Sequence, residues 1–442
     1  ILLIASYYFY AGWKPEYLIL IIYSTLVDYF VGLKILQTDN AAHRKRLLGI
    51  SLISNLGLLF IFKYFNFFSQ TMQEVLNIWN ISIDFPTINL ILPVGISFYT
   101  FQTLSYTIEV YRGNIKPEKH FGVFALFVSF FPQLVAGPIE RPQHLLPQFR
   151  QKFNFDPERI SSGLGLMLWG MFKKVVIADQ LAYIVNLVYN NPSNWQGLMI
   201  IVATYSFAFQ IYCDFSGYSD IAIGAARVMG FDLRINFKEP YLAQSIADFW
   251  RRWHISLSTW FRDYLYIPLG GSRVSRRRTY INLLIVFIVS GLWHGANWTF
   301  VIWGGIHGLY MVLGLWTKNI RENSFQYLTS HHPRLMLRLK VFSTFHLVVF
   351  AWIFFRANSL PDTFVIIGNM FRLTPIELYT FGVILVLIFL LGGLNPLHIH
   401  RPIGDFLRTR SPQFRWTLYI VLALMIINLG ASNEVPFIYF QF

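Results

Sequence analysis

Two histidines lie in sequence contexts that could support chemistry, His254 within DFWRRWHIS (248–256) and His294 within SGLWHGANW (290–298). Imidazole suits general base catalysis because its ordinary pKa is about 6.5 and burial favours the neutral form, which accepts a proton. Each histidine also has a structural interpretation. A histidine beside Trp and Arg commonly anchors a membrane protein at the lipid interface, and His254 alone would fit that role.

The position of His294 in its apolar run is more unusual. It lies about fourteen residues after Tyr280, which on a helix is roughly 20 Å, well inside a hydrocarbon core of about 30 Å. Ionisable side chains at that depth are costly and commonly mark a functional site. Gly291 and Gly295 bracket His294, so either a substrate or a packed helix could approach closely. A metal site would need companion ligands at suitable spacing, which the sequence lacks, so no metal is expected.

Other polar residues in apolar segments are candidates for structural roles. His307 in WGGIHGLY has no charged neighbour in the sequence, which favours packing and hydrogen bonding. Asp214 and Asp220 in DFSGYSD either line a polar cavity or pair with Lys173 or Lys174, and we favour the ion pairs.

Composition identifies the class of protein. Of 442 residues, 55% are hydrophobic and 13% are charged, about half the charged share of a soluble domain. The net charge of +14 does not point to nucleic acid, because the basic residues cluster in short connectors such as 44–46 and 276–278, as in the cytoplasmic loops of membrane proteins. The single cysteine, Cys213, excludes an internal disulfide. The sequence has no GxSxG elbow, HExxH motif, P-loop or dinucleotide fingerprint.

Apolar runs recur along the whole chain and predict an all-α integral membrane protein with about 11–12 transmembrane helices. The expected spans are 1–12, 16–36, 47–68, 89–110, 120–137, 161–190, 197–229, 279–297, 298–316, 341–357, 376–394 and 415–430. No long linker separates them, so we predict a single polytopic membrane domain over residues 1–442. The chain starts at Ile1 inside an apolar run, and we expect the natural N-terminus to lie upstream.

Loop charge predicts the orientation. The connector 34–46 is basic whereas 69–89 contains no Lys or Arg, so the first is expected in the cytoplasm and the second outside. The basic segments 276–278, 318–340 and 401–415 are consistent with the cytoplasmic side, and 358–375 then faces outward.

The segment 243–269 differs because it is rich in Trp but too charged for a simple span. Placed on one helix at 100° per residue, it has two faces. The apolar face carries Trp250, Trp253, His254, Leu257, Trp260, Phe261, Tyr264 and Leu265, and the polar face carries Arg251, Arg252, Thr259, Arg262 and Asp263. We predict an amphipathic helix that lies at the interface or re-enters the membrane. The apolar position of His254 argues against a simple headgroup anchor.

Four motifs together resemble the membrane-bound O-acyltransferase family: WHG (293–295), DFWRRWHISLSTWFRDYLYIPLGGSR (248–273), DFSGYSDIAIGAARVMG (214–230) and FPQLVAGPIERP (131–142). The resemblance covers nearly the whole chain. More specifically, the motifs resemble those of the bacterial branch that contains alginate O-acetyltransferase membrane subunits and the teichoic acid D-alanyl transfer protein. It implies helices and re-entrant or interfacial segments around a central tunnel. By the same resemblance His294 matches the near-universal histidine of the family, and His254 the second polar site residue.

The resemblance also implies the reaction. A cytoplasmic thioester would donate an acyl group across the bacterial inner membrane. The expected co-substrate is an acyl-CoA, specifically acetyl-CoA, and no bound cofactor is expected. The acceptor would be a polysaccharide, reached through an extracytoplasmic serine esterase-like partner. Expected catalytic residues are His294 and His254, and expected substrate-binding residues are Trp250, Arg251, Arg252, Trp253, Trp293 and Asp214. The alternatives are D-alanyl transfer from a carrier protein to teichoic acid, and a transporter or flippase whose histidines relay protons.

Overall fold

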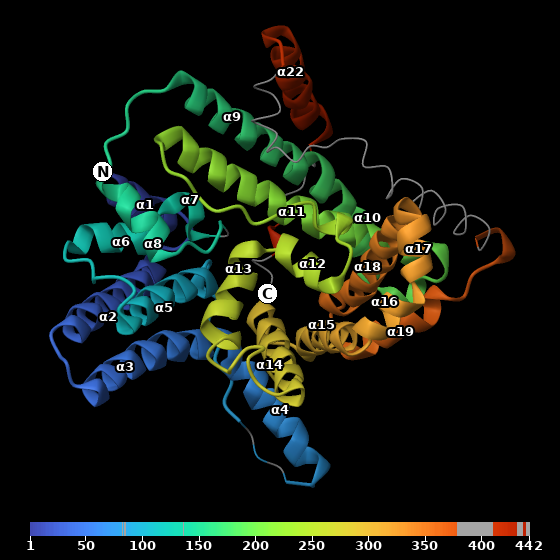
Figure 1. The fold of residues 1–442 in the computed structure, drawn as a ribbon, viewed down its shortest axis with the longest axis horizontal. Helices are drawn as coiled ribbons and strands as arrows, with labels where there is room; N and C mark the ends of the chain where they lie inside the picture. Colours follow the sequence, from blue (N-terminus) through green and yellow to red (C-terminus); the bar gives the residue numbers. More distant parts are fainter. Residues whose placement is uncertain (82, 84, 136, 378–409, 431–435, 439–442) are drawn as a thin grey trace. The chain divides into compact units, whose positions relative to one another are not determined.

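The computed structural model describes residues 1–442 except 82, 84, 136, 378–409, 431–435 and 439–442. Within these residues every regular element is a helix and no strand occurs, which confirms the predicted all-α class (Figure 1). The chain divides into two compact units. The first contains residues 1–160 and 225–234, and the second contains 161–224 and 235–442.

The first unit is built from eight labelled helices and the last residues of a ninth, α11. Its helices are α1 (Leu2–Ala11), α2 (Leu18–Leu36), α3 (Ala41–Leu59), α4 (Phe65–Ile78), α5 (Ile96–Arg112), α6 (Phe121–Ser129), α7 (Phe131–Leu134) and α8 (Pro142–Leu145). Helices α2, α3 and α5 pack against one another. Asp28 of α2 is fully buried between them and accepts hydrogen bonds from Ser51 and Asn55 of α3 and from Thr107 of α5. These bonds compensate for burying a carboxyl group inside the helix bundle.

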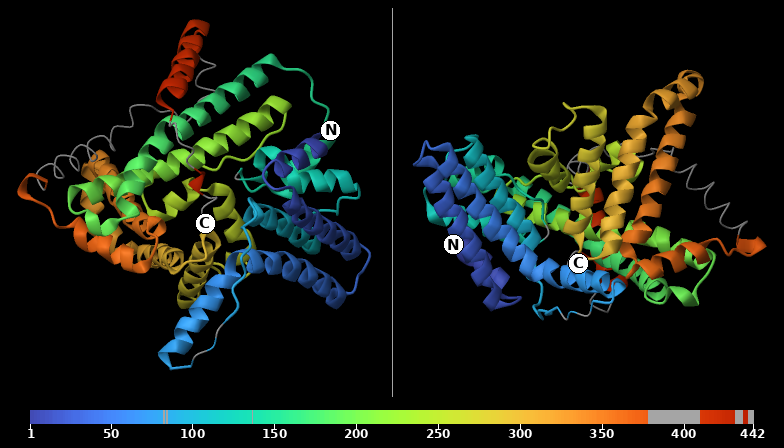
Figure 2. Two further views of the ribbon diagram at one scale, coloured as in Figure 1. Left: turned by 180° about the vertical axis from the view of Figure 1, so that it is seen from behind. Right: turned by 90° about the horizontal axis from the view of Figure 1, so that it is seen from below.

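The second unit carries most of the aromatic core. Its helices are α9 (Pro157–Met171), α10 (Asp179–Tyr189), α11 (Leu198–Met229), α12 (Ile246–Arg252), α13 (Ile255–Phe261), α14 (Arg276–His294), α15 (Trp298–Trp316), α16 (Lys318–Ser324), α17 (Gln326–His331), α18 (Pro333–Arg356), α19 (Leu360–Met370) and α22 (Pro412–Leu429). Figure 2 shows the same helices from two further sides. Trp253, Trp303 and Trp352 are almost fully buried in this core.

Seven described helical segments are long and apolar enough to cross a membrane, fewer than the 11–12 spans expected from the sequence. They are Pro15–Leu36, Ala41–Ile78, Pro157–Tyr189, Leu198–Met229, Trp298–Trp316, Pro333–Arg356 and Pro412–Leu429. Some of the remaining predicted spans form shorter helices. Helix α1 has 10 residues and α5 has 17. The predicted span 376–394 lies outside the described residues apart from its first two.

Two predicted boundaries were wrong for local reasons. The predicted span 120–137 is broken at Phe130, whose backbone is not helical and separates α6 from α7. Pro132 is in the first turn of α7, where its missing N–H and fixed φ are tolerated but would disrupt a helix interior. The predicted external loop 69–89 begins in a helix, because α4 continues to Ile78.

Glycines set the closest helix contacts in the second unit. Gly170 of α9 faces Gly217 of α11, and a Cβ on either would crowd the other's carbonyl oxygen. Helices α9 and α11 accordingly run side by side in Figure 1. Gly291 of α14 and Gly304 of α15 make an equally close crossing, since a Cβ on Gly291 would overlap the carbonyl oxygen of Phe300. Small residues are the usual means of close helix packing in membranes.

The predicted pairing of the two carboxylates in DFSGYSD is confirmed. The Asp220 carboxylate forms an ion pair with Lys173 at 2.8 Å, and the Asp214 carboxylate forms one with Lys174, also at 2.8 Å. Both lysines lie in a π-helical turn, Phe172–Ala178, that joins α9 to α10 in one continuous helix. The second Asp214 oxygen accepts a hydrogen bond from the backbone N–H of Ile438, at 2.8 Å.

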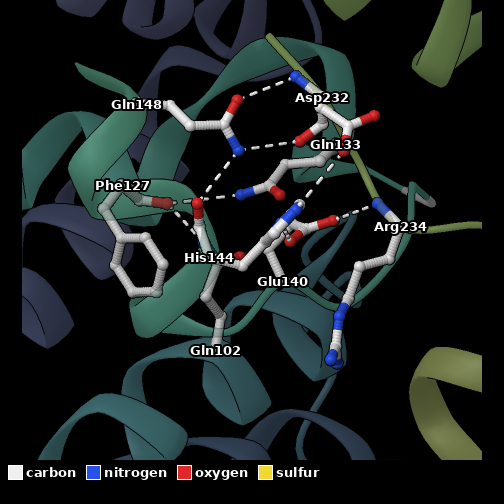
Figure 3. Close-up of polar contacts among 8 residues, drawn as sticks. All are labelled: Gln102, Phe127, Gln133, Glu140, His144, Gln148, Asp232 and Arg234. Atoms are coloured by element: carbon white, nitrogen blue, oxygen red, sulfur yellow. Dashed lines mark hydrogen bonds and ion pairs between the residues drawn. The ribbon is translucent and has the colours of Figure 1, made fainter. Parts of the chain in front are cut away.

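In the first unit, a cluster of polar side chains forms hydrogen bonds with the segment that follows α11 (Figure 3). The Gln148 side chain donates to the Asp232 carbonyl and accepts from the Asp232 N–H, at 2.9 and 2.8 Å. Fully buried Glu140 accepts from the Arg234 N–H at 2.7 Å and lies 2.8 Å from Nδ1 of His144. Nε2 of His144 lies 3.5 Å from the Asp232 carboxylate.

This cluster predicts a pH-dependent stability. The hydrogen bond with Glu140, aided by the charge of Asp232, raises the pKa of His144 above its ordinary 6.5, against burial and Arg234. A folded-state pKa above the unfolded value means that the stabilisation is complete below about pH 6.5 and is lost as the pH rises through the folded pKa. The melting temperature of the wild type should therefore fall between pH 6 and 8 relative to that of His144→Gln. Parallel melting curves for the two proteins across this range would contradict the assignment.

Candidate active site

His254 lies in a break between two short helices. A single amphipathic helix through 243–269 was predicted, and this is wrong. Helix α12 ends at Arg252, Trp253 is extended, and His254 has left-handed backbone angles with φ of 42° before α13 starts at Ile255. Such angles are uncommon for a residue other than glycine and often occur at functional sites.

The two predicted faces of this segment are nevertheless largely confirmed. Trp250, Trp253, His254, Leu257, Trp260 and Phe261 are all buried, whereas Arg251 and Arg262 are exposed. The apolar pattern therefore located the buried side chains correctly, although it did not reveal the break.

Asn236 holds the break and was not identified from the sequence. Its carbonyl accepts from the Ile255 N–H at 2.9 Å, and its side-chain oxygen accepts from the Ser256 hydroxyl at 2.6 Å. Its amide group donates to Ser219 of α11 at 3.2 Å. The bond to Ile255 pairs a backbone N–H at the start of α13 that has no partner within its own helix. The context INFKEP contains no pattern that would have indicated this role.

His294 is the last residue of α14, and the chain turns at 295–297 before α15 starts at Trp298. It is 3% exposed. Trp293, Trp303 and Phe355 surround its ring edge-on, with centroid distances of 4.9, 5.0 and 5.3 Å. Gly291 and Gly295 pack against residues of α15. Of the two roles expected for these glycines, close approach of a substrate or of a packed helix, the structure shows helix packing.

The structure brings the two predicted catalytic histidines into one aromatic cluster. The Trp293 ring contacts both, at centroid distances of 6.0 Å from His254 and 4.9 Å from His294. On its other side His254 meets Phe215 edge-on at 4.6 Å. Because both imidazoles are at least 97% buried and surrounded by apolar rings, a charge that develops there is only weakly screened by water.

A cavity of about 980 Å³ opens beside this cluster. Its basic lining residues are Arg251, Arg262, Arg276 and Lys318. Its apolar lining includes Trp250, Leu283, Val286 and Phe287. Ser290, four residues before His294 on α14, also lines it, so the cavity extends to within one turn of that histidine. Cations beside an apolar chamber suit a ligand with anionic groups at one end and an uncharged arm.

Only some of the other predicted binding residues line this cavity. Trp250 and Arg251 line the cavity. Arg252 instead pairs with Asp248 on the same helix at 3.0 Å. Trp253 is 1% exposed and packs in the core on Trp352 at 5.1 Å. Asp214 is held by Lys174 as described above, one residue before the Phe215 that contacts His254.

Comparison with known proteins gives independent evidence. The model of the MBOAT, membrane-bound O-acyltransferase, family matches residues 119–357, a range that contains both histidines and the whole cavity lining. A peptidoglycan O-acetyltransferase of Helicobacter pylori is 39% identical over 85% of this chain and 74% of its own. A probable alginate O-acetylase, AlgI, of Pseudomonas putida is 37% identical over 100% of this chain and 94% of its own. A teichoic acid D-alanyltransferase of Bacillus subtilis is 27% identical over 62% of this chain and 71% of its own.

Proposed function

The chain belongs to the membrane-bound O-acyltransferase family, and from this premise we propose that it transfers an acetyl group from acetyl-CoA to an exported polysaccharide. It is a multi-pass membrane protein and an acyltransferase. The observation that supports the finer proposal is the cavity with basic residues at Arg251, Arg262, Arg276 and Lys318, because coenzyme A joins a phosphate-rich nucleotide to an uncharged arm.

The proposed chemistry uses the two buried histidines. The donor enters from the cytoplasm with its phosphates near the basic residues and its thioester towards the end of α14. His294 takes the proton of the acceptor hydroxyl as that oxygen attacks the thioester carbonyl carbon. His254 donates a hydrogen bond to the carbonyl oxygen as negative charge develops on it. The carbon–sulfur bond then breaks, and the departing thiolate takes the proton from His294.

The acceptor is proposed from the relatives. The relatives named for O-acetylation of alginate and peptidoglycan are 37% and 39% identical to this chain, whereas the D-alanyltransferase is 27% identical. This difference in identity favours acetyl transfer over D-alanyl transfer. We place residues 1–442 in one catalytic membrane domain of the bacterial inner membrane. An extracytoplasmic serine esterase-like partner completes the transfer to the polymer, and neither a bound cofactor nor a metal takes part.

Steady-state kinetics with varied acetyl-CoA test the donor site. Arg251→Gln should raise the KM for acetyl-CoA by about five- to tenfold and leave kcat nearly unchanged, because a phosphate contact made equally in ground and transition states is uniform binding. The matched control is Arg252→Gln, whose arginine pairs with Asp248 outside the cavity lining. A larger KM effect for Arg252→Gln than for Arg251→Gln would move the donor phosphates away from this cavity.

A further inference from the structure

A third histidine, His307, lies directly behind the wall of the cavity. It is on α15, is 0% exposed, and was assigned only to packing and hydrogen bonding from the sequence. The rings of Phe249 and Phe287 lie nearly parallel to it, at centroid distances of 6.2 and 6.3 Å and interplanar angles of 9° and 23°. The imidazole is therefore packed against two aromatic rings of nearly the same orientation.

The polar contact of His307 is with Trp250 of α12. The indole Nε1–H donates to Nδ1 of His307 at 3.3 Å. An indole N–H is only a donor, so Nδ1 must be the acceptor and the neutral imidazole carries its proton on Nε2. Nε2 of His307 has no hydrogen-bond partner among the residues that the structure describes. An apolar side chain could fill this site without burying an imidazole N–H, so packing alone does not account for a histidine here.

The hydrogen bond fixes a residue of the cavity wall. Trp250 lines the cavity, as do Phe287 of α14 and Met311, one turn after His307 on α15. Trp303 in turn contacts both His307 and His294, with centroid distances of 5.1 and 5.0 Å. His307 thus lies between a wall residue of the donor cavity and the aromatic cluster around His294.

We propose that His307 is a positioning residue that orients the Trp250 indole in the cavity wall and thereby sets the affinity for the arm of the thioester donor. This inference rests on the proposed function of the cavity. Without the acceptor at Nδ1, the buried indole N–H of Trp250 loses its hydrogen bond, and the ring must either turn into the cavity or leave a buried donor unsatisfied.

A double-mutant cycle on coenzyme A binding, measured by calorimetry on the full chain in nanodiscs, tests the proposal. His307→Phe should weaken binding by at least about fivefold, the scale of one lost buried hydrogen bond. His307→Asn should stay within about twofold of wild type, because its amide oxygen can accept from the indole in place of Nδ1. In a Trp250→Phe background the same His307→Phe change should cost less than about twofold, since no N–H remains to be left unpaired.

A parallel cycle of His307→Phe with Trp303→Phe measures the packing component. Trp303 also contacts His307, but its indole N–H has no hydrogen-bond partner in the described part of the chain. Larger coupling with Trp250 than with Trp303 supports the proposal. Equal coupling, or additive effects with Trp250, overturns it while leaving acetyl transfer intact. A wild-type protein that neither binds coenzyme A nor transfers acetyl would remove the proposed function and this inference with it.

Discussion

Replacing His294 by alanine should abolish acetyl transfer, with a loss of at least about a hundredfold in kcat. A positioned general base contributes roughly 10² to 10⁴ to the rate, and His294 lies in the same aromatic cluster as His254, since both contact the Trp293 ring. The measurement is the rate of acetyl transfer by purified variant and wild type in detergent or nanodiscs.

The control for this prediction is folding. His294 packs against Trp293, Trp303 and Phe355, so alanine leaves a small cavity and a lower melting temperature is expected. His294→Gln keeps more of the volume and should be folded yet equally inactive, because an amide cannot accept the proton at neutral pH. If either folded variant retained a rate within about tenfold of wild type, His294 would not be the base.

Replacing Gly291 by alanine should disrupt the crossing of α14 and α15. The added Cβ would overlap the Phe300 carbonyl oxygen, which is backbone and cannot turn aside. Overpacking of this kind costs about 1–3 kcal/mol or more, and here it also displaces the end of α14 that carries His294. We expect a melting temperature several degrees lower and a fall in kcat, measured by thermal unfolding and initial rates.

Gly305→Ala on α15 is the matched control. Among the described residues, no heavy atom outside the local backbone of α15 lies within 4 Å of the position of a Cβ at Gly305, and alanine is favoured over glycine in a helix by up to about 1 kcal/mol. This variant should be as stable as the wild type or more so. Equal losses for the two variants would mean that the close crossing at Gly291 does not limit stability.

The sequence predicted the helical class and many of the helices because hydrophobic length carries that information. It did not predict the interruption between α12 and α13, since the left-handed backbone at His254 depends on Asn236, eighteen residues earlier, and on Ser219 of α11. It located α1 within two residues, but it did not predict the break in the 120–137 region. Apolar composition alone does not distinguish a span from a short buried helix.

The sequence indicated the two histidines of the candidate site, but not their arrangement or most of the residues around them. The motifs indicated His254 and His294, and the structure shows that both contact Trp293. Arg251 and Arg252 are neighbours with the same chemistry, and only the fold shows that the first lines the cavity while the second pairs with Asp248. His307 lacked any charged neighbour in the sequence, and its contact with Trp250 joins residues 57 positions apart.

The most direct test of acetyl transfer by His294 follows a radiolabelled acetyl group. Inverted membrane vesicles from cells that express the wild type, His294→Gln or no added protein, with the polysaccharide enclosed in their lumen, would receive acetyl-CoA labelled in the acetyl group on their outer, cytoplasmic face. We expect label to accumulate on the polymer or on a partner protein only with the wild type. Label that appears equally with His294→Gln, or no label with acetyl-CoA but efficient transfer from a D-alanyl carrier protein, would contradict it.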